Sequence, residues 1–250
     1  MEWRAEAILL AVRRHGETAA IIDVLGEVQG RQPGIVRGGA GRRLAPILQP
    51  GTTLDVTWRA RIEAHLGTMV VEPIKARAGA MMGDRESLAG LSSVTALCAF
   101  GLPERQPYPA LFRQTEALLD MIGQTEVWPF AYLLWEVALL AEMGYGLDLS
   151  SCAVTGATER LAYVSPRSGR AVTEEGAGPW ADRLLPLPAC LTGTPPDTLA
   201  DVVTGLRTTG YFLEHRLAAA QAGRPLPPSR ARLVASLERR ARDAGRLGGP

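Results

Sequence analysis

Hydrophobic and polar residues alternate along residues 54–66 of the chain. The apolar positions are Leu54, Val56, Trp58, Ala60, Ile62, Ala64 and Leu66, and the polar positions are Asp55, Thr57, Arg59, Arg61, Glu63 and His65. A period of two residues is typical of a β-strand with one buried face. We therefore predict one long strand, Leu54–Leu66, which must curl as barrel strands do.

Four more strands are predicted in the first 75 residues. They are expected at Trp3–Val12, Ala19–Leu25, Gly34–Arg37 and Thr68–Glu72, and Gly67 ends the long alternating segment. Short strands separated by glycine-rich turns favour a small antiparallel barrel.

The periodicity becomes helical after Pro73. Apolar spacing predicts helices over residues 84–100, 109–123, 129–143 and 197–222, and a last helix that begins at Pro228-Ser229. Residues 151–195 are polar and rich in turns, with two short β-like runs, Leu161–Val164 and Arg170–Thr173. The fold class is therefore α+β. We expect a barrel domain at residues 1–78 and a helical domain at residues 79–250, interrupted at about residues 151–195.

Charge is distributed unevenly along the 250 residues. The net charge is only +1, yet residues 1–78 and 201–250 are each basic and the segment between them is acidic. Such asymmetry suggests modules with different partners. Lys75 is the only lysine, so nearly all positive charge sits on arginine, whose planar fork can bind a phosphate through two hydrogen bonds.

The densest basic segment runs from residue 31 to residue 61. It contains six arginines and a single acid, Asp55; the arginines are Arg31, Arg37, Arg42, Arg43, Arg59 and Arg61. Gly38, Gly39 and Gly41 would let the backbone approach phosphates closely. This pattern predicts a nucleic-acid-binding face on these six arginines. The alternative is a charged barrel face that is merely solvated.

Two further features leave alternatives open. The tail arginines, Arg230, Arg232, Arg239, Arg240, Arg242 and Arg246, form either a second DNA contact or a solvated helix end. Trp58 shares its face with Val56 and is expected in the core, whereas Trp3 could stack on a base or pack inside.

Several classes of function are disfavoured. The chain has no GxxxxGK[ST] loop, no HExxH motif and no Ser-His-Asp order, so we expect neither an ATPase nor another enzyme. No run of about 20 residues is free of charge, so no membrane span is expected. The start has no secretory leader, and the three cysteines are too scattered for a disulfide framework, which favours the cytoplasm.

The chain resembles the RecO family of bacterial recombination mediators. The segments that carry the resemblance are HGETAAIIDVLGEVQGR, IVRGG, LQPGTTLDVTW, YGLDLSSCAVTG, YFLEHRL and PLPPSRARLV, over roughly residues 5–240. The resemblance implies a five-stranded OB-fold barrel, followed by a helical domain with a zinc-ribbon-like insertion. It also implies DNA repair through the RecF pathway, in which the protein binds single- and double-stranded DNA and anneals complementary strands. The implied protein partners are RecR and the acidic C-terminal tail of single-strand binding protein, on strands where recombinase is loaded.

The chain departs from the family pattern in this insertion. Many family members carry two CxxC pairs there, which form a zinc site. Here Thr155 stands where the second cysteine of the first pair would be, after Cys152, and SPRSGRAVTEEG contains no cysteine. We therefore predict a degenerate ribbon with no metal and no other cofactor.

Two rival functions remain at this stage. The first is an OB-fold RNA-binding factor without catalytic activity, because phosphate contacts do not distinguish sugars. The second is a metal-dependent nuclease that would use scattered Asp and Glu side chains, although their spacing does not favour it.

Overall fold

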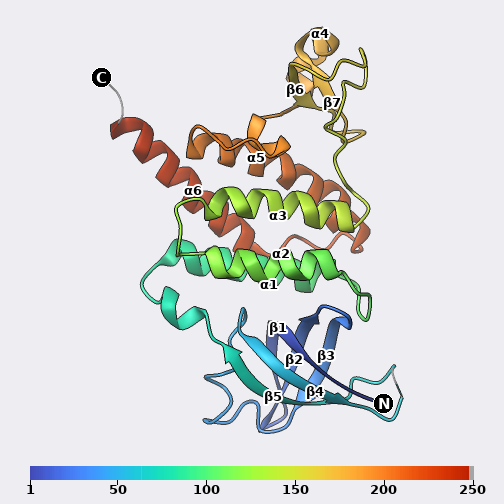
Figure 1. Cartoon of the computed structure of the whole chain (residues 1–250), viewed down its shortest axis with the longest axis vertical. Coiled ribbons are helices and arrows are strands. Elements are labelled where there is room, and N and C mark those ends of the chain that lie inside the picture. The colour runs from blue at the N-terminus through green and yellow to red at the C-terminus, as the bar shows by residue number, and fades with distance from the viewer. Residues whose placement is uncertain (63, 248–250) are drawn as a thin grey trace. The chain divides into compact units, whose positions relative to one another are not determined.

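The first part of the computed structural model, which describes residues 1–62 and 64–247, is a closed five-stranded barrel. Its strands are β1 (Glu2–His15), β2 (Ala19–Gly26), β3 (Gly30–Val36), β4 (Thr53–Arg59) and β5 (Thr68–Lys75). They pair in the order β1-β2-β3-β5-β4, and β4 closes the barrel on β1 (Figure 1). Neighbours are antiparallel except β3 and β5, which meet in parallel at Ile35 and Thr68. The predicted OB-fold barrel is confirmed.

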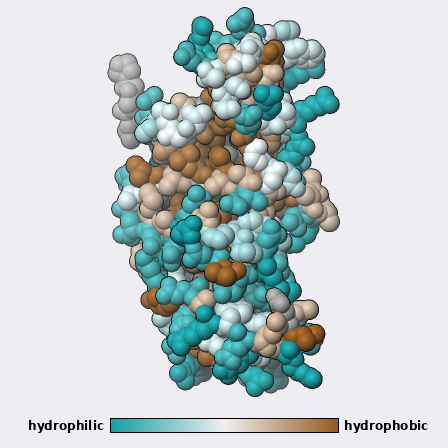
Figure 2. All heavy atoms as spheres, turned by 45° about the vertical axis from the view of Figure 1, so that its right-hand side comes forward, coloured by the Kyte–Doolittle hydropathy of each residue, from teal (hydrophilic) through white to brown (hydrophobic). Residues whose placement is uncertain are grey.

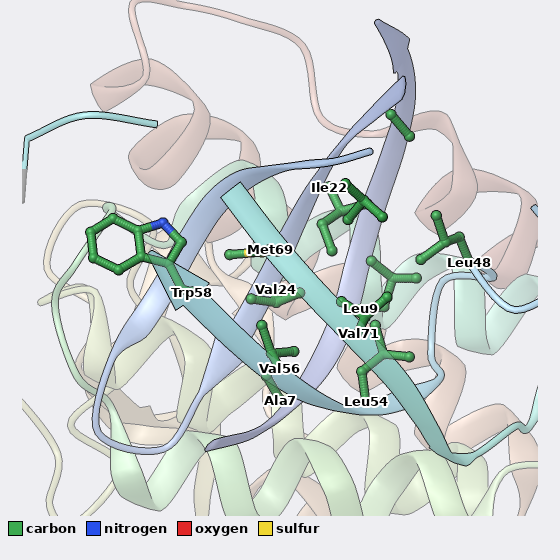
Figure 3. Close-up of a cluster of buried hydrophobic side chains, with 12 residues drawn as sticks. Ala7, Leu9, Ile22, Val24, Leu48, Leu54, Val56, Trp58, Met69 and Val71 are labelled. Atoms are coloured by element: carbon green, nitrogen blue, oxygen red, sulfur yellow. The ribbon is translucent and has the colours of Figure 1, made fainter. Parts of the chain in front are cut away.

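The barrel encloses a hydrophobic core to which every strand contributes (Figure 3). Leu54, Val56 and Trp58 all point inward, and Trp58 is only 2% exposed. The predicted alternation is thus confirmed over the first half of the segment, and Trp58 is a core residue.

The second half of the predicted strand Leu54–Leu66 is wrong, because β4 ends at Arg59. Thr68 at the start of β5 pairs with Arg59, so the antiparallel ladder of β4 and β5 ends at this pair. The indole N–H of Trp58 donates to the Leu66 carbonyl at 3.1 Å, and a Cβ on Gly67 would lie 2.4 Å from that same nitrogen. The chain therefore folds back over the tryptophan. Ile62 is 54% exposed, and Glu63 lies outside the described residues.

Two helices complete the first compact unit, which comprises residues 1–124 and 227–230. After the short 3-10 helix η1 (Ala78–Met81) come α1 (Arg85–Gly101) and α2 (Pro109–Met121). Asp84 caps α1 by accepting the N–H groups of Glu86 and Ser87. Because α1 packs against β1, residues on the outer face of the barrel such as Ile8 and Leu25 are fully buried. The predicted boundary at residue 78 separates sheet from helix, whereas the contacts group α1 and α2 with the barrel.

Arg77 joins the barrel to α2 inside this unit. Its guanidinium donates to the Asp120 carboxylate at 2.7 Å, to the Gly51 carbonyl at 2.7 Å and to the Thr53 hydroxyl at 2.9 Å. The side chain is buried, and Lys75 pairs with the same carboxylate from the surface. Burial would raise the pKa of Asp120, but hydrogen bonds from Lys75 and Arg77 outweigh it and lower that pKa overall.

The second unit, residues 125–226 and 231–250, is mainly helical. It contains α3 (Trp128–Glu142), α5 (Leu199–Phe212), the π-helical continuation η4 (Leu213–Ala218) and, from Ala231 onward, α6 (Pro228–Leu247). α3 packs against α5, and the buried Glu136 carboxylate accepts the Thr209 hydroxyl at 2.5 Å. These helices agree with the predicted ranges, and α3 is the expected buried helix.

A small ribbon interrupts this unit. Its strands β6 (Leu161–Val164), β7 (Ala171–Thr173) and β8 (Leu185–Pro186) form a sheet in the order β7-β6-β8. Figure 1 labels β6 and β7 of this ribbon. The short helices α4 (Glu174–Ala177) and η2 (Gly178–Arg183) lie between β7 and β8 in the sequence, and η3 (Ala189–Thr192) follows β8. Both predicted β-like runs are confirmed.

Candidate nucleic-acid interface

The six predicted arginines have different environments. Arg31 is the least available, because its guanidinium donates to Asp23 at 3.0 Å, to Glu104 at 3.3 Å and to the Leu102 carbonyl at 2.8 Å. Burial raises the pKa of Asp23 although Arg31 pairs with it. Arg31 therefore holds the α1–α2 connection on the barrel, and the other five arginines are exposed.

Arg37, Arg42 and Arg43 lie in the loop after β3. The loop is held against the β1–β2 hairpin, because the Ala40 N–H donates to the Thr18 carbonyl at 3.0 Å. A Cβ on Gly39 would lie 2.8 Å from the Ala20 Cβ, so the glycine permits this close approach. None of the three arginines pairs with a carboxylate of the described residues. Their charge is therefore available to a phosphate.

The hairpin adds two arginines that sequence reasoning missed. Arg13 and Arg14, at the end of β1, are exposed and have no ion pair in the described part of the chain. We call Arg13, Arg14, Arg37, Arg42 and Arg43 the basic rim. The Arg-Arg pair before the hairpin was visible in the sequence, but its proximity to the glycine-rich loop depends on the β2–β3 register. Glu17 is an exposed acid on the same hairpin.

One row of paired residues links the rim to β4. It runs across all five strands as Arg13, Ile21, Ile35, Thr68, Arg59 and Glu2. Paired residues share one face of a sheet, and this face is the outer one because Trp58 points inward. Arg13 and Arg59 are thus separated by four strand spacings, about 19 Å along the barrel surface. Arg37 follows Ile35 by two residues, so Arg13, Arg37 and Arg59 lie along one outer strip, whereas Arg14 pairs with the core residue Ala20 and is on the other face of β1.

Two acids neutralise part of this strip. Glu2 accepts from Arg59 at 2.8 Å, and that hydrogen bond lowers the pKa of Glu2 and raises that of Arg59. Asp55, the only acid in the basic segment, accepts from Arg4 at 2.5 Å, which lowers the pKa of Asp55. Asp55 therefore neutralises none of the predicted arginines. Arg61 has no ion pair with a described residue.

Trp3 is partly exposed and stacks on Trp58, with ring centroids 6.0 Å apart and planes at 16°. One face of its indole therefore meets the barrel core. Whether a base stacks on Trp3 stays a hypothesis.

The tail arginines divide into two groups. Arg230 is buried and Arg240 pairs with Glu126 at 3.6 Å. The other four are exposed: Arg232, Arg239, Arg242 and Arg246. At 100° per residue these four fall within an arc of about 80° on α6. We call them the α6 stripe, and Asp243 lies on the same side of the helix.

The comparisons with known proteins identify the family of this chain. Residues 1–77 match the family described as "Recombination protein O N terminal", and residues 82–225 match "Recombination protein O C terminal". The chain belongs to the RecO family of DNA repair proteins. A relative from Roseobacter denitrificans, named DNA repair protein RecO, is 57% identical over 96% of this chain and all of its own length. Relatives of the same name from a Ruegeria species and from Dinoroseobacter shibae are 54% and 53% identical, over 96% of this chain and 100% and 99% of their own lengths.

In the ribbon of this RecO-family chain, hydrogen bonds surround the sulfur of Cys152. The Cys152 sulfur accepts the backbone N–H groups of Val154, Thr155 and Thr173 at 3.3–3.4 Å. Burial would raise the pKa of this thiol, but hydrogen bonds from Thr155 and Thr173 lower it to about 6. In the described part of the chain, no three His, Cys, Asp or Glu side chains are grouped as metal ligands. The predicted absence of zinc stays a prediction, which metal analysis of the purified protein tests.

No helix in the described ranges has the length and apolar character needed to cross a bilayer.

Proposed function

We propose that this chain is a non-enzymatic recombination mediator of the RecF pathway that binds single- and double-stranded DNA and anneals complementary strands. The observation that carries the proposal is the strip of exposed arginines around a closed barrel, in a chain of the RecO family. Neutralising backbone charge on two strands lowers the repulsion that opposes their pairing. No bond is made or broken in this mechanism.

The salt dependence of single-strand binding tests the basic rim. Each phosphate contact contributes about 0.7 to the slope of log K against log salt for a single strand. Replacing Arg42 and Arg43 by glutamate should flatten that slope by about 1.4 or more. Arg85→Glu is the matched control, because Arg85 is exposed and has no ion pair in the described ranges but lies at the start of α1. A slope that stays the same in the double variant would remove these two arginines from the interface.

An annealing protein must hold two strands, and the α6 stripe is our candidate for the second contact. The variant Arg232→Gln/Arg239→Gln/Arg242→Gln/Arg246→Gln removes four exposed charges without altering a buried group. We expect strand annealing to slow by tenfold or more, while single-strand binding by the barrel changes little. Equal losses of both activities would argue against a separate second surface.

The proposed protein partners are RecR and the acidic tail of single-strand binding protein. Hydrophobic side chains gather on the face of the helical unit shown in Figure 2. On α3, Phe130, Leu134 and Val137 are partly exposed at helical spacing, which suits an apolar contact with a peptide. Annealing of oligonucleotides precoated with single-strand binding protein, with and without RecR, tests both partners. Adding recombinase to the coated strands in the same two conditions tests its loading.

The two rivals each predict a different result. An RNA-binding factor would prefer single-stranded RNA over DNA of the same sequence in competition. A metal-dependent nuclease would degrade labelled DNA in the presence of magnesium or manganese. We expect DNA to compete at least as well as RNA, and the labelled DNA to remain intact.

A further inference from the structure

A half-open cavity of about 290 Å³ lies within the helical unit. Three segments line it: residues 144–146 after α3, residues 167–169 in the β6–β7 turn, and Phe212 with Arg216 at the junction of α5 and η4. Gly144, Gly146 and Gly169 contribute no side chain, so the space stays open. The cavity is distinct from the basic rim and from the α6 stripe.

The lining carries two positive charges and no acid. Arg167 and Arg216 are both exposed, and neither pairs with a carboxylate in the described ranges of the chain. One Nη of Arg216 donates to the backbone carbonyl of Arg167. This bond holds the Arg216 side chain beside the β6–β7 turn. Two guanidinium groups at one cavity without a counter-ion are the arrangement expected of a site for an oxyanion.

The backbone around Arg216 supports the same inference. Residues Leu213–Ala218 form a π-helix, a conformation that is rare and is found frequently at functional sites. Here the π-helical segment carries one of the two arginines, so the irregularity and the unpaired charge coincide.

We propose that this cavity binds a phosphomonoester group, with the guanidinium groups of Arg167 and Arg216 donating to its oxygen atoms. A phosphomonoester carries about −1.5 to −2 charges near neutral pH, which matches the two arginines. A single carboxylate or an internal phosphodiester carries only about one negative charge. The group could belong to free phosphate, to a nucleotide or to the terminal phosphate of a nucleic-acid strand. All three sources present the same phosphomonoester to the two arginines. A bound phosphate would link the β6–β7 turn of the ribbon to the π-helical segment.

Isothermal titration of the full-length chain with inorganic phosphate tests the site. We expect saturable binding, weakened about tenfold or more by Arg167→Gln and by Arg216→Gln, because each removes hydrogen bonds to a charged group. Arg216→Lys should restore only part of the affinity, since lysine keeps the charge but not the fork. Arg85→Gln is the control, because it removes from the other unit an exposed arginine that has no ion pair with a described residue. Circular dichroism and thermal melting show whether each variant is folded.

Oligonucleotides with a 5′-phosphate or a 5′-hydroxyl distinguish the sources. Tighter binding of the phosphorylated strand, lost in Arg167→Gln, would identify a strand end. If a nucleotide competes with inorganic phosphate for the cavity, and the 5′-phosphate and 5′-hydroxyl strands bind equally well, the natural ligand is a small molecule. The proposal is overturned if phosphate does not bind saturably, if both Gln variants bind it as the unmodified chain does, or if acetate competes as well as phosphate. Binding of the 5′-hydroxyl strand through the barrel is a separate measurement, so its outcome does not decide this one.

Discussion

The chain contains two β-sheets that are stabilised in different ways. The barrel is closed, its strands are seven to fourteen residues long, and each strand contributes to one core. The ribbon has strands of four, three and two residues, and only Cys152, Val172 and Ala177 form its buried cluster. A closed barrel buries enough apolar surface to tolerate unneutralised arginines on its outer face. The ribbon depends on a few polar contacts, notably those to the Cys152 sulfur.

The largest expected effect comes from a substitution in the barrel core. Trp58→Ala should lower the free energy of unfolding by about 3–5 kcal/mol, because it opens a cavity and removes the hydrogen bond to Leu66. Val172→Ala in the ribbon should cost about 1.5 kcal/mol, from two lost methylene equivalents. Hydrogen exchange of the amides in each sheet measures both. Trp180→Ala is the control: this side chain is 57% exposed, and the change should stay within about 0.5 kcal/mol. Equal losses of unfolding free energy in Trp58→Ala and Val172→Ala would contradict the view that the barrel core contributes more stability than the ribbon cluster.

Next in size is the buried arginine that ties the barrel to α2. Arg77→Ala removes the buried donor shared by the Asp120 carboxylate, the Gly51 carbonyl and the Thr53 hydroxyl, and should cost about 3 kcal/mol although Asp120 keeps Lys75. Lys75→Ala removes an exposed partner of the same Asp120 and should cost under about 1 kcal/mol. Urea denaturation, monitored by circular dichroism, compares the free energies of unfolding of the two variants. If the two variants are equally stable, the buried contacts of Arg77 contribute nothing beyond a surface ion pair.

The ribbon should respond to pH through Cys152. Its folded pKa is lowered to about 6, so the thiolate stabilises the ribbon above the unfolded thiol pKa, and this contribution is lost as pH falls through 6. Amide protection factors of Val172 and Thr173 should therefore decrease between pH 8.5 and pH 6. Cys152→Ser does not titrate in this range and should remove that dependence. The same pH dependence in the serine variant would assign it to another group.

The smallest effect concerns the outer strip of the barrel. Glu2 holds Arg59, so Glu2→Gln should release this arginine to a phosphate and steepen the salt slope of single-strand binding by about 0.7. Glu6→Gln removes the same charge from an exposed residue of the same strand that has no ion pair in the described ranges. It should leave the slope nearly unchanged. Identical slopes in both variants would place Arg59 outside the DNA contact.

Much of the fold could be predicted because it depends on local periodicity. The alternation at Leu54, Val56 and Trp58 identified the core face of β4, and helical spacing located α1, α2 and α3. The end of β4 could not be predicted, since apolar residues continue to alternate as far as Leu66. The strand stops because Thr68 pairs with Arg59 and the turn between them closes over Trp58.

The candidate site, too, could be predicted only in part from the sequence. Residue types and spacing along the chain were sufficient to predict a basic barrel and the exposure of Arg37, Arg42 and Arg43. Only the tertiary structure showed that Arg31 is held by Glu104, 73 residues away in sequence, and that Arg13 and Arg14 lie beside the glycine-rich loop. The physical reason is that charge is a property of one residue, whereas its availability depends on which distant carboxylate the folded chain brings within hydrogen-bonding distance.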